Sequence, residues 1–466
     1  MRLKKIYLGF LLVSILACGS PFATAPTPPP RVTRLGLARF STATPTINPT
    51  ATTIPISSPM ATLTPTPLPT NATSRPTEPL EAATLAAQNL STVIALPTAT
   101  LPPIIVPPTP AVVSAAAELA VPEPLAPLSQ ASIAPLTPDQ YHLGYGVQLA
   151  EAKNMELAVP GGFTWAKHDL NIRKNMNFLS NADNLLSDLK KYGTEHVLVK
   201  LIVWGENGLP DAPRTSNEIS TYAKNAAEAA EFIRQKHGPD FKTIAYEIWN
   251  EPNLNYEWEG NPNPTEFVNL LKAASEAIRQ ADPQAVIVSG APSPGGDYDD
   301  LKFLEDMYVA GAKGLIDAVG SHPYGGPWPP EHPDGIDPNG NGYPFFRKPE
   351  KQRAIMERYG DTTTQIWATE FSWLAGVPGC NFGEHTAWQV SIEQQADYLV
   401  TAYTYAHQNW PWMGPMFVVY DFGLTGRYDR CHPAGGYSIL RPDPNSDTVL
   451  TPAAAALFAM PKYAGW

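Results

Sequence analysis

The chain has 466 residues, of which 51 are proline and only 16% are charged. Average proline usage is about 5%, and 25 of the prolines lie between Pro21 and Pro138, so the whole chain is not one compact domain. The net charge of the whole chain is −12. Residues 1–138 have seven basic and four acidic side chains and contribute +3, so residues 139–466 carry −15. This acidic surface argues against a nucleic-acid partner, which would need clustered Lys and Arg, and favours a neutral ligand.

Residues 1–20 have the pattern of an export signal. Three basic residues precede an apolar run from Ile6 to Ala17, which is too short for a stable membrane-spanning helix. The segment Ile15–Cys18 resembles a bacterial lipobox, although a residue smaller than Leu16 is commoner there. We therefore expect lipidation of Cys18, a membrane-surface anchor and an extracellular or cell-envelope location. The alternative is an ordinary cleaved signal with an incidental cysteine.

Residues 21–138 form a Thr/Pro/Ala-rich segment whose only aromatic residues are Phe22 and Phe40. Its repeated Thr-Pro and Pro-Pro steps remove backbone donors and disfavour helix. We expect a disordered, semi-extended linker, either a stalk that is O-glycosylated on Thr or a spacer with no role beyond its length.

Residues 139–466 alternate short apolar runs with helical patterns, which is typical of repeated βα units and a parallel sheet. Eight such units in about 330 residues predict an α/β fold, a single (β/α)8 TIM barrel, with a doubly wound open sheet as the alternative. The expected strands are Gly144–Gln148, Phe163–Lys167, His196–Trp204, Thr243–Trp249, Ala285–Ser289, Ala318–His322, Gln365–Glu370 and Pro415–Tyr420.

Three helix starts can be read from capping residues. Thr215–Glu218 has the spacing of a capping box before a helix that runs to about Lys236, Asn263-Pro264 caps a helix over Phe267–Gln280, and Thr451-Pro452 opens the last helix. The first unit is irregular, because Ala150–Pro160 leaves little room for a full helix.

Two of the expected strands end in a glutamate. Glu251 follows the fourth strand in the run Trp249-Asn250-Glu251-Pro252, and Glu370 ends the seventh. Chemistry in a barrel of this kind belongs at the carboxyl ends of the strands. A glycosidic bond is cleaved by one carboxyl group that protonates the leaving oxygen and one carboxylate opposite it. The two glutamates supply both groups.

On these motifs, Tyr141–Trp466 resembles the clan A glycoside hydrolases, and within the clan the types of families 5 and 39. The resemblance implies a retaining hydrolase with Glu251 as acid/base and Glu370 as nucleophile, acting on a β-linked poly- or oligosaccharide. It also implies that Asn250 binds the sugar 2-hydroxyl, that His322 lines the site, and that Tyr324 orients Glu370.

Two departures from the family pattern concern residues that would contact substrate or nucleophile. Many family 5 members have an arginine on the second strand, where this chain offers Lys167 or His168. The aromatic platform after the eighth strand is Tyr420 instead of a tryptophan. Among the tryptophans, Trp204 and Trp373 lie at or just beyond strand ends, and we expect them to stack on sugar rings.

Cys380 and Cys431 follow the seventh and eighth strands, so a disulfide between them is expected in an exported protein, with two free thiols as the alternative. No metal or cofactor is expected, and the protein is expected to be a monomer. The rival functions are a non-catalytic carbohydrate-binding or adhesion lipoprotein on the same barrel, and a clan A transglycosylase.

Overall fold

The computed structural model describes residues 142–174, 176–424, 431–442 and 450–463. The expected signal segment, the lipidation site at Cys18 and the linker all lie outside these residues. Among the described residues, no helix has the length and apolar character needed to cross a membrane.

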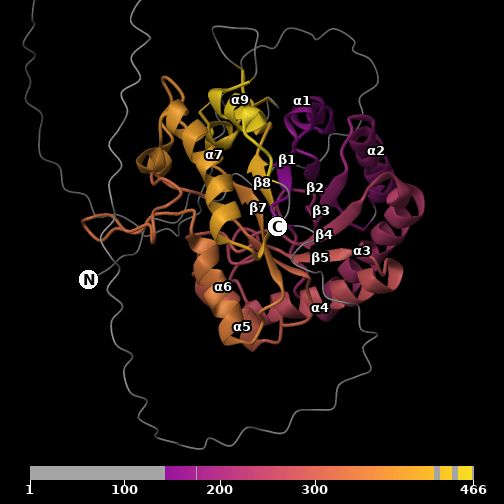
Figure 1. Cartoon of the computed structure of the whole chain (residues 1–466). Helices are drawn as coiled ribbons and strands as arrows, with labels where there is room; N and C mark the ends of the chain where they lie inside the picture. Colours follow the sequence, from indigo (N-terminus) through magenta and orange to yellow (C-terminus); the bar gives the residue numbers. More distant parts are fainter. Residues whose placement is uncertain (1–141, 175, 425–430, 443–449, 464–466) are drawn as a thin grey trace, which may run out of the picture. The chain divides into compact units, whose positions relative to one another are not determined.

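Eight parallel strands close into a barrel in chain order, with β1 paired to β8, and the helices surround them (Figure 1). This confirms the predicted (β/α)8 barrel and excludes the open sheet. The strands are β1 Tyr145–Gln148, β2 Trp165–Asn171, β3 His196–Ile202, β4 Thr243–Ile248, β5 Val286–Ser289, β6 Ala318–Ser321, β7 Gln365–Phe371 and β8 Met413–Val419.

The helices begin where the capping residues predict. Thr215 and Glu218 form a capping box on α3, the Asn263 side chain caps α4, and the Thr451 side chain caps α9. The first connection is irregular, as expected, with one four-residue helix between short 3-10 turns. The helices are α1 Met155–Ala158, α2 Phe178–Lys191, α3 Ser216–His237, α4 Pro264–Ala281, α5 Asp300–Val309, α6 Lys348–Arg358, α7 Ile392–Asn409, α8 Pro433–Tyr437 and α9 Pro452–Ala459.

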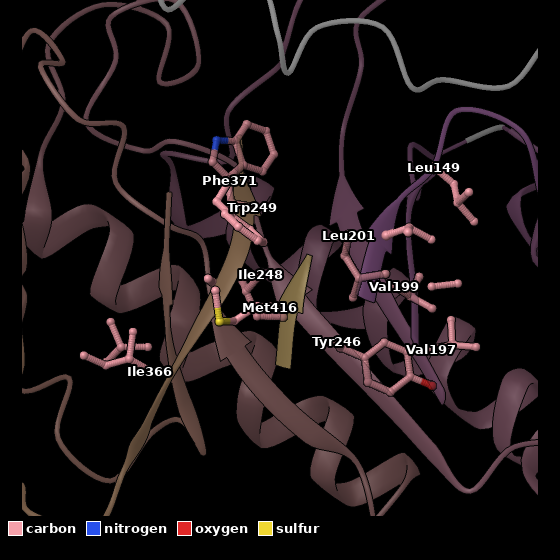
Figure 2. Packing of buried hydrophobic residues seen from close by; sticks show 14 of the residues in the cluster. Leu149, Val197, Val199, Leu201, Tyr246, Ile248, Trp249, Ile366, Phe371 and Met416 are labelled. Atoms are coloured by element: carbon pink, nitrogen blue, oxygen red, sulfur yellow. The ribbon is translucent and has the colours of Figure 1, made fainter. Parts of the chain in front are cut away.

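The strands are apolar on both faces because helices cover the outside and side chains fill the inside. Along β3, Val197, Val199 and Leu201 lie in one row in the large cluster between strands and helices (Figure 2). Leu198 belongs to a separate cluster that draws residues from β2 to β8 and fills the interior. Because side chains alternate along a strand, Lys200 shares the inward face with Leu198.

The inner cluster closes the floor of the barrel. Its largest members, Trp165, Trp367 and Phe417, pack edge to face. A Cβ on Gly146 of β1 would lie 2.5 Å from the Phe417 ring, so glycine is required where the ring approaches the backbone. The polar residues of the barrel therefore lie above a dry apolar layer, toward the carboxyl ends of the strands.

Candidate active site

The end of β4 turns sharply at three consecutive residues that precede Pro252. Trp249 and Glu251 have φ values of 71° and 33°, a left-handed region that costs a non-glycine residue of order 1–3 kcal/mol. The Trp249 ring leaves the strand to pack edge to face on Trp258, and its Nε1 donates to the carbonyl oxygen of Glu257 at 3.1 Å. This turn brings Asn250 and Glu251 to the mouth of the barrel.

The end of β7 is also irregular. The register between β7 and β8 shifts between Ala368 and Phe371, and a bulge of this kind re-aims the side chains next to it. Phe371 packs in the outer core, while Glu370 is fully buried and makes its contacts with residues of the barrel interior. The left-handed turn after β4 and the register shift between Ala368 and Phe371 thus lie beside the two candidate carboxylates.

Neutral donors and one lysine hold the two oxygens of Glu370. Gln148 Nε2 donates to Oε1 at 2.6 Å, Lys167 Nζ donates to Oε1 at 3.1 Å, and Tyr324 Oη donates to Oε2 at 3.0 Å. These partners come from β1, from β2 and from the segment after β6. The predicted role of Tyr324 as the residue that orients Glu370 agrees with this contact.

Two further nitrogen-bearing side chains lie near Glu370 at slightly longer range. Lys200 Nζ lies 3.6 Å and His322 Nε2 lies 3.7 Å from Glu370 Oε1. Burial alone would raise the pKa of the Glu370 carboxyl, but His322, Lys167 and Lys200 outweigh it and hold the pKa below its ordinary value. Glu370 is therefore ionised at neutral pH.

One imidazole ring lies between the two candidate carboxylates. His322 Nδ1 is 2.9 Å from Glu251 Oε1, and its Nε2 faces Glu370. Glu251 and His322 are each 2% exposed. Glu251 and Glu370 therefore face each other across the width of a single ring.

Two lysines form buried ion pairs beneath this pair. Lys167 Nζ lies 2.9 Å from Glu247 Oε2, and Lys200 Nζ lies 3.0 Å from Asp169 Oδ1. Burial would lower the pKa of Lys200, but the surrounding carboxylates, Asp169 first, outweigh it and raise the pKa. Lys200 therefore keeps its charge.

The side-chain amide of Asn250 is bonded at both ends. Its Oδ1 accepts from Lys200 Nζ at 3.0 Å, and its Nδ2 donates to Glu257 Oε1 at 3.0 Å. Burial, and then the charge of Glu251, raise the pKa of the Glu257 carboxyl well above its usual value. The buried Glu257 carboxyl therefore favours its neutral, protonated form.

Several residues expected at the site are not there. His168 points to the other side of β2, where its ring nitrogens face the carbonyl oxygens of Ala150 and Asp169, so of the two candidates on this strand only Lys167 reaches Glu370. Tyr420 is fully buried and donates to the carbonyl oxygen of Asn154 at 3.1 Å. It is a packing residue and not a sugar platform.

The two tryptophans expected to stack on sugar are also closed to solvent. Trp373 is fully buried between Phe346 and Tyr398, and its Nε1 donates to the carbonyl oxygen of Trp328 at 2.7 Å. Trp204 is 4% exposed and belongs to the outer core. Both lie just past strand ends, and the loop that covers Trp373 is the β6–α6 loop, which contains Trp328. The strand pattern alone does not reveal such a cover.

Three residues that contact the candidate site residues were not predicted from the sequence: Gln148, Lys200 and Glu257. A signal existed for Lys200, since it is the single charged residue after His196 in an otherwise apolar strand, and a buried charge in such a run needs a partner. Gln148 is likewise the polar end of β1. Glu257 lies in the β4–α4 loop, where nothing in the local pattern distinguishes it from an exposed acid.

The expected bridge between Cys380 and Cys431 is present, with an S–S distance of 2.13 Å. It joins the loops that follow β7 and β8. On the same face, the Tyr437 ring lies 4.9 Å from the ring of Tyr324. Among the described residues, no group of three or more His, Cys, Asp or Glu side chains could hold a metal ion.

Part of the chain is similar to proteins of a known family. Residues 163–367 match the family described as Cellulase (glycosyl hydrolase family 5); the match contains Asn250, Glu251 and His322 and ends three residues before Glu370. A β-xylosidase of Geobacillus stearothermophilus is 29% identical over 98 residues, which are 21% of this chain and 19% of that enzyme.

Solved structures of low identity are similar to part of this chain. A family 39 glycoside hydrolase from Bacteroides cellulosilyticus WH2 is 20% identical with a TM-score of 0.49, over 69% of this chain and 64% of that one. The endoglucanase Cel5A of Thermotoga maritima is 15% identical with a TM-score of 0.43, over 69% of this chain and 100% of that one. The chain covers 19% of the length of the β-xylosidase and 64% of the length of the family 39 hydrolase, which is less than two thirds of each.

Proposed function

We propose that this chain, which carries a glycosyl hydrolase family 5 domain over residues 163–367, is a retaining hydrolase that cleaves a β-linked glycan by double displacement. The observation that supports this most directly is the placement of Glu251 and Glu370 on the two nitrogens of His322. Two carboxyl groups that lie close together on facing strands are what cleavage of a glycosidic bond requires.

The environments of the two glutamates suggest their roles. Glu370 is ionised by surrounding cations, and Tyr324 donates to its Oε2. Burial, followed by the charges of Glu370 and Glu251, raises the pKa of the Tyr324 hydroxyl well above its usual value, so Tyr324 keeps its proton and remains a donor. A fixed, ionised carboxylate suits the nucleophile, which leaves Glu251 as the acid/base.

The reaction then has two steps. In the first, a Glu370 oxygen bonds to the anomeric carbon while Glu251 gives its proton to the departing glycosidic oxygen. In the second, Glu251 takes a proton from water, and the water oxygen displaces Glu370 from the sugar. Asn250, next to Glu251, donates a hydrogen bond to the 2-hydroxyl of the bound sugar.

Replacement of Glu370 tests the proposal. Glu370→Ala is expected to lower kcat on aryl β-xylosides and β-glucosides by at least about 10⁴-fold, because the covalent intermediate cannot form. A 2-fluoro aryl glycoside should label Glu370 in the wild type, as peptide mass analysis would show. Glu228→Ala, on the exposed face of α3, is the matched control and should retain activity.

The same substrates test the division of roles. Azide should restore activity to Glu251→Ala, since a small nucleophile needs no general base for the second step. Full activity of Glu370→Ala would overturn the mechanism. Tight binding of glycans by a wild-type protein that hydrolyses none of them would instead favour the carbohydrate-binding alternative.

A further inference from the structure

The orientation of the Asn250 amide is fixed by the chemistry of its neighbours. An ammonium group has only donors, so the Asn250 atom that lies 3.0 Å from Lys200 Nζ must be the carbonyl oxygen. The nitrogen then faces Glu257 Oε1 at 3.0 Å. Exchange of the amide oxygen and nitrogen would place an N–H against Lys200, so only one orientation is compatible with both contacts.

The two groups that hold the amide are themselves held. Lys200 and Glu257 are each 1% exposed, and the Lys200 ammonium also contacts Asp169 at 3.0 Å. Glu257 is anchored through its backbone, because its carbonyl oxygen accepts from Trp249 Nε1. Neither restraint on Asn250 is a mobile surface side chain.

The fixed amide has one hydrogen to offer. Of its two Nδ2 hydrogens, one goes to Glu257, and the part of the chain that the structure describes supplies no acceptor for the other. Asn250 precedes Glu251, and the Lys200 ammonium that it contacts lies 3.6 Å from Glu370 Oε1. The proposed function assigns this remaining hydrogen to the 2-hydroxyl of the bound sugar, on the carbon next to the anomeric carbon.

We infer that Lys200 is a positioning residue that locks Asn250 as a hydrogen-bond donor and thereby makes the site select sugars with an accepting hydroxyl at position 2. This inference rests on the proposed function and deepens it. A site built around such a donor discriminates against an analogue that lacks the hydroxyl, because the buried donor is then left unpaired.

The test compares an aryl β-glycoside with its 2-deoxy counterpart in wild type, Lys200→Met, Asn250→Ala and the double variant. The readout is the ratio of the two kcat/KM values. Lys200→Met also weakens the charge near Glu370, but that loss affects both substrates and cancels in the ratio. We expect Lys200→Met to lower the ratio by roughly 10- to 100-fold, and to lower it little further when Asn250 is already Ala.

Two other variants complete the design. Lys200→Gln, whose amide can still donate to Asn250, should keep more of the selectivity than Lys200→Met and serves as the test if the latter does not fold. Lys348→Met removes a largely buried lysine from its pair with Asp300, away from the site, and should leave the ratio unchanged.

Each outcome supports or overturns the inference. An unchanged ratio in Lys200→Met, or an additive effect in the double variant, would overturn it while leaving the hydrolase intact. A wild type that turns over both glycosides without preferring the hydroxyl would do the same. A wild type inactive on every glycoside tested would overturn the proposed function, and this inference with it.

Discussion

Glu257 illustrates how a single buried carboxyl links the site to stability. Its Oε1 accepts from Asn250, and its Oε2 has no hydrogen-bond partner among the described residues. A proton on Oε2 removes the cost of burying a charge there. The neutral acid is therefore compatible with the contact to Asn250, because the carbonyl oxygen of a carboxylic acid still accepts.

Because the folded pKa of Glu257 is raised, the folded protein holds this proton after the unfolded chain has lost it near pH 4.3. Above that pH, the contribution of Glu257 makes the free energy of unfolding decrease as pH increases, by up to about 1.4 kcal/mol per pH unit. Glu257→Gln should thus be more stable than wild type at pH 7 and similar at pH 4. Urea unfolding at both values checks this, and equal differences at the two values would contradict it.

The sharp end of β4 depends on its neighbour β5. A Cβ on Gly290 would lie 2.6 Å from the carbonyl oxygen of Ile248 and 3.0 Å from that of Trp249. Both are backbone atoms of the segment that turns Glu251 into the mouth. The left-handed turn at Trp249 and Glu251 can therefore pack against β5 only because residue 290 is a glycine.

Gly290→Ala should displace this turn, and we expect it to lower the free energy of unfolding by about 1–3 kcal/mol. Its loss of kcat should exceed what the small unfolded fraction explains, because a misplacement of about 1 Å at reacting groups can cost about 10²-fold. Thermal unfolding and kinetics on an aryl glycoside measure the two effects. Gly342→Ala is the control, since its Cβ would meet only Ile336 at 3.8 Å, and equal behaviour of the two variants would refute the prediction.

The elements were more predictable than the site. Strands such as β3 and β7 are continuous apolar runs, as strands covered on both faces must be, and Asn263 or Thr451 mark helix starts through local bonds. Glu251 and Glu370 could also be predicted as a pair, because each lies at the end of an apolar strand. Lys200 and Gln148 did not, because their importance depends on which strands become neighbours across the interior.

The aromatic predictions failed for a related reason. Trp373 lies just past β7, as a residue that contacts substrate would, but its ring packs beneath the β6–α6 loop, where Gly325 lies close enough that an added Cβ would be 1.8 Å away. Position along a strand gives the end of the barrel at which a residue lies. It does not give which loop covers it.

At the scale of the whole molecule, we propose that residues 1–20 export the chain and that a lipid on Cys18 holds it at a membrane surface. The basic residues before the apolar run Ile6–Ala17 support this. Cys18→Ser should move the protein from the membrane fraction to the soluble fraction of a bacterial host and abolish incorporation of labelled fatty acid. Lipid labelling that persists in Cys18→Ser would contradict the proposal.

The contacts of Glu370 have a consequence for the order in which the protein can assemble. Its partners Gln148 and Lys167 are 222 and 203 residues away along the chain, and contacts of such long sequence separation form late because of their entropic cost. A nascent chain that has completed six strands already contains Lys167 and Lys200 but lacks Glu370. The same step that seats β7 between β6 and β8 thus adds Glu370 to these contacts, so the candidate site and the finished barrel arise together.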